Sequence, residues 1–294
     1  METRAAAGIA MVGFGEAGRA IVQGWGRPLS SRVGAYDLKS EDATAAGEIA
    51  AACDAAGIGR ASGPGALLPE RDLVFCLVTA DRAADAAAAA APHLKPGALW
   101  LDGNSCAPGT KKRAAQIVED AGGRYVDLAI MAPIHPRLHK TPMLIAGPHA
   151  EAARAALAAL DMQVEVAGDR VGDASSIKMI RSVMIKGMEA LTAECLLAAR
   201  RAGVEDAVLA SFERSDPGID WRRRSAYALS RMTAHGIRRA AEMREVAATL
   251  RELGLPDRMA SATALWQDEI GALYLGDPDG EVSEIADRIL GALR

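Results

Sequence analysis

The sequence predicts an α/β fold, with a doubly wound parallel sheet followed by an all-α C-terminal part. Two observations support this prediction. Up to about residue 168, short apolar runs alternate with helix-compatible stretches, as they do in βαβ units. After about residue 170 no strand-like run follows, and helical patterns with short Gly/Pro breaks continue to the end. We therefore expect two domains, residues 1–168 and residues 169–294.

The strand-like runs are apolar throughout, as strands buried on both faces must be, and Leu73–Val78 is the clearest of them. One long helix is expected at Ala174–Ala202, where Gly203 can end it. Strands are expected at Gly8–Val12, Arg32–Tyr36, Leu73–Val78, Ala98–Asp102, Arg124–Ala129, Met143–Ala146 and Val164–Val166. Helices are expected near 16–26, 41–56, 81–93, 109–121 and 149–159.

The composition narrows the class of protein. The chain has 294 residues and a net charge of −4, so no general attraction to nucleic acid is expected. Its four cysteines are far apart and form no CxxC pair, which argues against a disulfide framework and against a zinc site. The sequence shows neither a signal-peptide pattern nor a long uncharged apolar stretch. We expect a cytoplasmic protein with no metal site and no membrane partner.

A glycine motif follows the first predicted strand and opens the first predicted helix. In this GxGxxG motif, Gly13 permits a tight turn, Gly15 lets the backbone approach a pyrophosphate, and Gly18 allows close helix–strand packing. The helix N-terminus supplies N–H groups for the phosphates. The context predicts a Rossmann domain that binds a dinucleotide; the alternative is the same turn without a cofactor. The expected cofactor-binding residues are Gly13, Phe14, Gly15, Glu16, Ala17, Gly18, Asp37, Val78, Thr79 and Asn104.

The choice of cofactor depends on the end of the second predicted strand. Asp37 lies nineteen residues after Gly18, where a carboxylate can bond the ribose hydroxyls of NAD and repel the 2′-phosphate of NADP. Lys39 lies two residues further on and could pair with that phosphate. We expect NAD, with NADP as the alternative.

Two later segments carry candidate chemistry. Asn104 and Ser105 follow the predicted strand Ala98–Asp102, at the sheet edge where open α/β folds bind ligands. Ordinary turn chemistry would explain the same two residues. In the long helix, Lys178 shares a face with Ser182, and Arg181 and Lys186 flank that face. A lysine on an otherwise apolar helix beside positive charge is a candidate acid or base with a lowered pKa, or else an ion-paired or snorkelling lysine.

In this order, the segments resemble the β-hydroxyacid dehydrogenase family, which includes 3-hydroxyisobutyrate and 6-phosphogluconate dehydrogenases. Asp102–Ser105 is similar to the family's D-x-S-T or G-G-N-S loop, and Gly172–Lys178 to its lysine-bearing helix. The C-terminal part, with Lys186–Ala190 and His235–Met243, is similar to a branch whose phosphogluconate-dehydrogenase-like domain has no known substrate. The resemblance implies a catalytic Lys178 and substrate contacts at Asn104 and Ser105.

The chain departs from the family pattern at several positions. Met131-Ala132-Pro133 stands where the family has S-G-G, Arg181-Ser182 stands where it has an asparagine, and Ala174 replaces a glycine. The expected substrate residues are Asn104, Ser105, Arg181, Ser182, Lys186 and Arg137. Arg137 lies in a loop where the family keeps substrate contacts, and it is either an anion anchor or a solvated charge.

The implied reaction is hydride transfer between nicotinamide and a hydroxy acid or related polar alcohol, with a neutral Lys178 accepting the hydroxyl proton. The implied substrate is a small anionic molecule, and the resemblance implies a homodimer or higher homo-oligomer. Two other interpretations stay open. One is an imine or keto reductase of the same architecture, and the other is a non-catalytic dinucleotide-binding protein.

Overall fold

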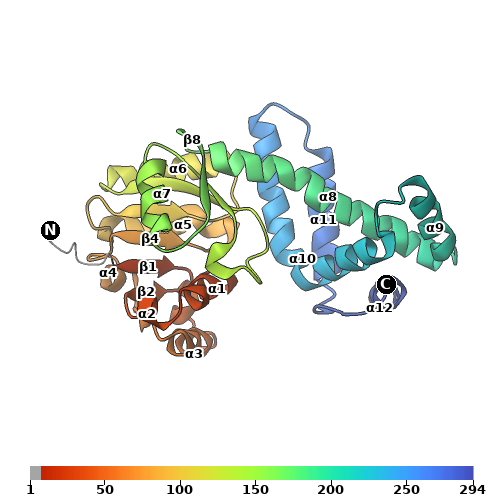
Figure 1. Cartoon of the computed structure of the whole chain (residues 1–294), viewed down its shortest axis with the longest axis horizontal. Helices are drawn as coiled ribbons and strands as arrows, with labels where there is room; N and C mark the ends of the chain where they lie inside the picture. The colour runs from red at the N-terminus through yellow and green to blue at the C-terminus, as the bar shows by residue number, and fades with distance from the viewer. Residues whose placement is uncertain (1–7, 294) are drawn as a thin grey trace. The chain divides into compact units, whose positions relative to one another are not determined.

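The computed structural model describes residues 8–293 and divides into two compact units, Met1–Lys178 and Met179–Arg294. The first unit holds the strands and the second is helical (Figure 1). The boundary predicted at residues 168 and 169 comes before the first turns of the long helix α8 (Asp173–Arg201), and compactness assigns those turns to the first unit. The helical domain is expected to contact the substrate and a second copy of the chain, and this role stays a prediction.

Eight strands within residues 8–293 form one sheet, in the order β3-β2-β1-β4-β5-β6-β7-β8. Order 3-2-1-4-5 is that of a doubly wound sheet. In such a sheet the strands are added outward in one direction from β1 and then in the other direction from β4. The predicted α/β fold is therefore confirmed. The strands are β1 (Ile9–Val12), β2 (Val33–Tyr36), β3 (Gly59–Arg60), β4 (Leu73–Cys76), β5 (Leu99–Asp102), β6 (Arg124–Ile130), β7 (Met143–Ala146) and β8 (Val164–Gly168).

The sheet is not parallel throughout, which corrects the sequence prediction. Strand β7 runs antiparallel to β6, whereas β8 is parallel to β7. The segment between β6 and β7 contains only a single 3-10 turn, Leu138–Lys140, and no crossover helix, so the chain turns back instead of crossing the sheet. Strand β3 was not predicted, because its two residues are exposed and carry no apolar signal.

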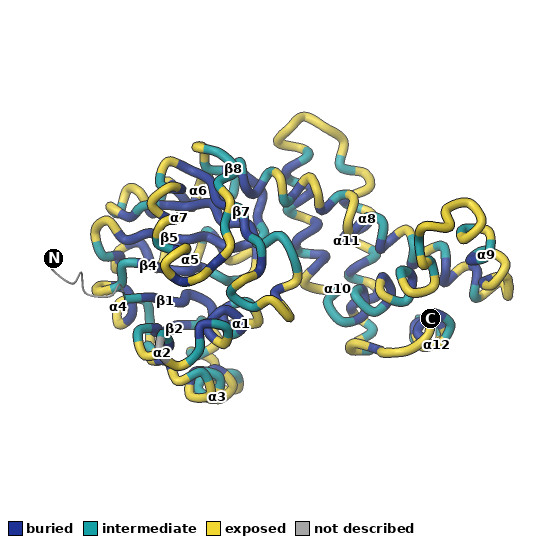
Figure 2. Tube along the Cα trace, viewed as in Figure 1, coloured by how far each residue is buried: buried dark blue, intermediate teal, exposed yellow. Residues whose placement is uncertain are grey.

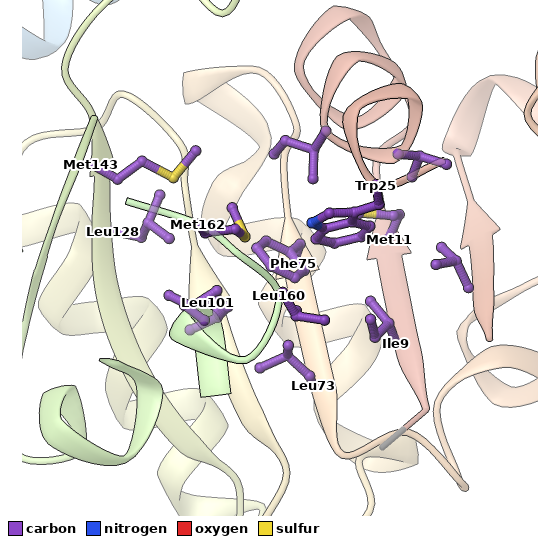
Figure 3. Packing of buried hydrophobic residues seen from close by; sticks show 14 of the residues in the cluster. Ile9, Met11, Trp25, Leu73, Phe75, Leu101, Leu128, Met143, Leu160 and Met162 are labelled. Carbon is purple, nitrogen blue, oxygen red and sulfur yellow. The ribbon is translucent and has the colours of Figure 1, made fainter. Parts of the chain in front are cut away.

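Helices cover both faces of the sheet. One apolar cluster joins Met11 and Phe75 to helices α1, α3 and α7, and the other joins Val74 and Trp100 to α4, α5 and α6. Figure 2 shows the central strands buried, and Figure 3 shows Trp25 of α1 beside Phe75. The helices are α1 (Glu16–Trp25), α2 (Arg27–Ser30), α3 (Ala46–Ala56), α4 (Pro64–Leu67), α5 (Ala83–Ala90), α6 (Pro108–Asp120) and α7 (Ala150–Ala158).

The second unit is built on long helices, as predicted. Helix α8 begins and ends within one residue of its predicted bounds, and Gly203 follows it with a φ of 71°. Helices α10 and α11 cross at glycines: a Cβ added to Gly236 would lie 2.6 Å from the Cα of Gly271. None of the helices described is long and apolar enough to cross a membrane. The remaining helices are α9 (Glu205–Ser215), α10 (Trp221–Glu252), α11 (Arg258–Gly271) and α12 (Val282–Ala292).

Candidate cofactor and active site

The glycine turn after β1 has room for a ligand at one position only. Gly13 has a φ of 88°, and a Cβ there would lie 2.9 Å from the Cγ1 of Val78. A Cβ on Gly18 would lie 3.2 Å from the Gly13 carbonyl oxygen. At Gly15, by contrast, no heavy atom of the described residues other than Gly15 and its chain neighbours Phe14 and Glu16 comes within 4 Å of such a Cβ. The turn therefore requires glycine for packing at Gly13 and Gly18, and leaves open space at Gly15.

The start of α1 completes this cradle. Glu16 begins the helix directly after Gly15, and no side chain of the described residues caps it. Its first N–H groups thus stay available for an anion, and the helix dipole favours negative charge there. Open space at Gly15 beside uncapped N–H groups is what a dinucleotide pyrophosphate needs. The chain's own residues fit the predicted cofactor.

Asp37 holds the glycine turn in shape. Its Oδ2 accepts a hydrogen bond from the Phe14 N–H at 2.8 Å, and its Oδ1 accepts one from the Lys39 N–H at 3.0 Å. Each oxygen keeps a second lone pair for a ribose hydroxyl. Arg19, which the sequence analysis missed, donates from Nε to the Phe14 carbonyl at 2.9 Å. An arginine one residue after the motif gave no sequence signal of that contact.

The loops after β4 and β5 meet the glycine turn at the carboxyl edge of the sheet. The Val78 N–H donates to Asn104 Oδ1 at 2.7 Å. The Asn104 Nδ2 donates to Asp102 Oδ1 at 2.6 Å and contacts Cys76 Sγ at 3.3 Å. Asn104 is only 4% exposed. These hydrogen bonds of its amide join the two loops. Its predicted contacts with substrate and cofactor stay predictions. Thr79 is exposed and Ser105 partly exposed in the same loops.

A buried ionic cluster lies beneath these loops, and the sequence analysis did not single it out. Lys111 of α6 is fully buried, with its Nζ 3.0 Å from Asp102 Oδ1 and 3.5 Å from Asp127 Oδ1. Burial alone would lower the pKa of Lys111, but the two carboxylates outweigh it and the pKa is raised. The Tyr125 hydroxyl donates to Asp102 Oδ2 at 2.6 Å, and burial raises its pKa well above the usual value. The available signal was an aspartate near the end of each of two apolar strands.

Lys178 lies in the second turn of α8 and is half-buried. The start of that helix is fixed to the sheet: Asp127 Oδ2 accepts hydrogen bonds from the N–H groups of Gly172 and Ser175. Because β6 reaches the carboxyl edge through Asp127–Ile130, the first turns of α8 lie at the edge that carries the glycine turn.

Lys186 lies in a buried ion pair of the second unit. Its Nζ lies 2.6 Å from Glu242 Oε2 and 3.5 Å from Ser182 Oγ, inside the second unit. Burial lowers its pKa, Glu242 partly restores it, and Arg239 and Arg238 lower it further. Glu242 thus offsets the charge of Lys186, and the substrate contacts predicted for Lys186 and Ser182 stay predictions. Ser182 is likewise buried.

The two arginines among the expected substrate residues are both exposed. Arg181 is exposed on α8, and Arg137 is exposed in the loop between β6 and β7. That loop is packed on α1: a Cβ on Gly24 would lie 2.9 Å from the Leu138 Cβ. Their roles stay predictions. Among the residues described, no group of three or more His, Cys, Asp or Glu side chains could hold a metal ion.

Comparisons with known proteins agree with this geometry. A conserved hypothetical protein from Sinorhizobium meliloti is 37% identical, with a TM-score of 0.74 and coverage of 99% of this chain and 98% of its own. A curated protein of Methanothermus fervidus, described as an uncharacterized 28.5 kDa protein in 7S RNA 5′region, is 29% identical over 150 residues. That match spans 51% of this chain and 57% of the relative.

Two more distant structures share the fold alone. The Mycobacterium tuberculosis 3-hydroxyisobutyrate dehydrogenase is 14% identical, with a TM-score of 0.74 over 98% of this chain and 99% of its own. An imine reductase from Myxococcus stipitatus, solved in complex with NADP+, is 18% identical, with a TM-score of 0.54 over 96% of this chain and 99% of its own.

Family comparison covers both units. Residues 199–270 match a domain of unknown function, DUF1932. Residues 8–164 match the NAD binding domain of 6-phosphogluconate dehydrogenase, and they include the glycine turn, Asp37 and the loops that meet at the carboxyl edge. By a match that covers more than half of its length, the chain belongs to the family that carries this NAD(P)-binding domain.

Proposed function

We propose that the protein is an NAD(P)-dependent oxidoreductase that acts on the CH–OH group of a hydroxy acid or related polar alcohol, with Lys178 as the acid and base. The observation that carries the proposal is the open space at Gly15 beside the uncapped start of α1, within a domain of a dinucleotide-binding family. The anchored first turns of α8 give Lys178 a fixed place at the same edge of the sheet.

The bound nicotinamide would supply the hydride chemistry, and the chain's residues would bind, orient and move protons. Gly13 to Gly18 and Asp37 would hold the pyrophosphate and ribose. Lys178 Nζ, when neutral, would accept the proton of the substrate hydroxyl, and would return it in the reverse direction. Arg137 and Arg181 would attract an anionic substrate, because both are exposed cations.

The cofactor preference proposed here is for NAD. Asp37 follows β2 directly, and both of its oxygens accept from backbone N–H groups, so its negative charge would be held where the ribose is expected. A fixed carboxylate repels a 2′-phosphate. Lys39 is exposed two residues away and supports NADP as the alternative.

We also propose a homodimer or higher homo-oligomer in the cytoplasm. Along α8, large apolar side chains recur at helical spacing and are exposed, from Ile177 (44%) through Met184 (61%) to Leu191 (62%). Such a stripe would be covered by a second copy of the chain. None of the four cysteines, all of which lie within residues 8–293, forms a disulfide, as expected in a reducing compartment.

One experiment separates this proposal from its two rivals. The full chain is mixed either with NAD or NADP and a panel of hydroxy acids and sugar acids, or with NADH or NADPH and a panel of ketones and cyclic imines, and NAD(P)H absorbance is followed. Turnover of a hydroxy acid that is lost in Lys178→Ala supports the proposal. Turnover of imines alone favours the imine reductase, and cofactor binding without any turnover favours a non-catalytic binding protein.

A further inference from the structure

Beneath the proposed site, two carboxylates stand side by side on neighbouring strands. Asp102 of β5 and Asp127 of β6 are register partners, and both are fully buried. Two like charges at adjacent strand positions destabilise a sheet unless a cation lies between them. Lys111 is that cation: its Nζ reaches Oδ1 of both aspartates and also donates to the Asp102 carbonyl at 2.5 Å. One cation and two carboxylates leave the cluster with a net negative charge.

Asp127 directs that charge at the start of α8. Gly172, which precedes the helix, has no side chain to cap it, and its φ of 108° disfavours any residue with one. The cap comes instead from β6. Asp127 Oδ2 accepts from the Gly172 N–H at 3.1 Å, from the Ser175 N–H at 2.9 Å and from Ser175 Oγ at 2.9 Å. These bonds satisfy N–H groups that a helix start otherwise leaves unpaired.

Asp102 directs its bonds at the loop that follows its own strand, β5. Its Oδ1 accepts from both the backbone N–H and the Nδ2 of Asn104, at 3.0 Å and 2.6 Å. The Asn104 side chain then accepts from the Val78 N–H at 2.7 Å. A chain of buried polar contacts thus runs from α8 through Asp127, Lys111, Asp102 and Asn104 to the Val78 loop.

We propose that Asp127 is a positioning residue for the reaction: together with Lys111 and Asp102 it sets the first turns of α8, and therefore Lys178, against the loop expected to hold the cofactor. This inference rests on the role proposed for Lys178. Stability alone is a poor reason for the cluster, because apolar side chains in place of a buried ionic group are often neutral or stabilising. Both carboxylates of this cluster bond the backbone of segments that carry proposed site residues.

The test measures amide hydrogen exchange and NADH binding on the full chain, so it needs no known substrate. The variants are Asp127→Asn, which keeps one acceptor oxygen, and Asp127→Ala, which keeps none. Glu205→Gln is the control, since Glu205 is also a buried carboxylate and is paired with Arg200 at 3.0 Å in the second unit. Ser175→Ala removes one of the three bonds and serves if the Asp127 variants do not fold.

We expect exchange at residues 173–178 to accelerate about tenfold in Asp127→Asn and further in Asp127→Ala. The dissociation constant for NADH should change less than about threefold, because the Asp102 arm is intact. Ser175→Ala should accelerate the same amides about threefold. Once a substrate is known, Asp127→Asn should lower kcat without raising KM.

The proposal is overturned if the Asp127 variants, or Ser175→Ala in their place, leave exchange at residues 173–178 unchanged. It is also overturned if exchange in the Asp127 variants rises evenly along the chain, or if Glu205→Gln accelerates residues 173–178 as much as they do. Failure of the proposed function looks different, since Lys178→Ala would then keep its activity. In that case the exchange pattern would still report whether Asp127 anchors the helix.

Discussion

Among the described residues, each unit buries one lysine. The pKa values of these two lysines are shifted in opposite directions. Lys111 faces two carboxylates, which more than offset burial, so its pKa is raised above 10.5. Burial lowers the pKa of Lys186, whose partner is Glu242, and two nearby arginines, Arg239 and Arg238, lower it further. The first cluster has one cation for two carboxylates. The second has three cations, Lys186, Arg238 and Arg239, for the two carboxylates of Glu189 and Glu242.

The two clusters use their ion pairs differently. In the second unit the ion pairs join helices α8 and α10. Lys186 pairs with Glu242, and Arg239 pairs with Glu189. In the first unit the carboxylates have further oxygen lone pairs, which accept from the backbone of Gly172, Ser175 and Asn104. A cluster with more acceptors than cations can thus organise loops and a helix start, whereas a cation-rich cluster joins helices.

The largest effect is expected from removing the cation of the first cluster. Lys111→Met leaves two buried carboxylates facing each other, and should lower the free energy of unfolding by about 3–5 kcal/mol. Chemical denaturation of the variant and the wild type checks this value. An unchanged stability would show that the carboxylates tolerate each other without the lysine.

The pH dependence of that variant gives a second check. In the wild type, the raised pKa of Lys111 means that its contribution is fully present below its unfolded value of 10.5 and is lost only as pH rises through the folded pKa. The contribution of Lys111 to the free energy of unfolding of the wild type therefore does not change with pH near neutrality. In Lys111→Met a proton can replace the missing cation, so the deficit should be smaller at a pH of about 5 than at about 8.

A smaller effect is expected from the equivalent change in the second unit. Lys186→Met leaves Glu242 still paired with Arg238, so the loss should be about 1–3 kcal/mol. NADH affinity should not change, because no residue of the glycine turn belongs to this cluster. Fluorescence titration with NADH checks the second point. A weakened affinity would mean that the second cluster also supports the cofactor site.

A change at Asp37 tests the cofactor preference of the first unit. Asp37→Ala removes the charge that repels a 2′-phosphate and also the acceptor for the Phe14 N–H. NAD should bind more weakly, and the preference for NAD over NADP should fall by about tenfold. Kinetics or binding with both cofactors measures the ratio. Equal use of NADP by the wild type would make Lys39 the determinant instead.

The smallest effect on folding is expected at the exposed stripe of α8. Met184→Glu should change the free energy of unfolding by no more than about 0.5 kcal/mol, because the side chain is exposed. It should nevertheless separate an oligomer into single chains if a second copy covers the stripe. Light scattering of wild type and variant decides this, and a wild-type mass near 30.6 kDa would refute the proposed oligomer.

Local signals predicted most of the fold. Apolar runs such as Leu73–Cys76 and the spacing of Gly13, Gly15 and Gly18 depend on neighbouring residues, which a sequence displays directly. Strand β3 was not predicted because an exposed strand of two residues has no apolar pattern. The antiparallel direction of β7 was not predicted because a strand's direction depends on the segment that connects it to the previous strand. The Lys111 cluster escaped for a related reason: its aspartates meet only through the register of β5 and β6.

The pairing of Lys186 shows the same limit at the candidate site. Helical spacing correctly placed Lys178 and Lys186 on α8, but it could not show that Glu242 of α10 would neutralise Lys186. Likewise, Asn104 was found at the correct sheet edge, while its bonds to Val78 and Asp102 depend on folded loops. Sequence reasoning located the candidate residues, and tertiary packing assigned their contacts.

Proton transfer by Lys178 is tested by measuring kcat and NAD(P)H affinity together for the wild type and for Lys178→Ala. The substrate is the one that the panel identifies. We predict that kcat falls by about 10²-fold or more while the cofactor dissociation constant stays nearly unchanged. Lys178→Arg keeps the charge but cannot accept the proton, and should be as inactive as the alanine variant. A near-normal kcat in Lys178→Ala would contradict the account, because another group would then have to move the proton.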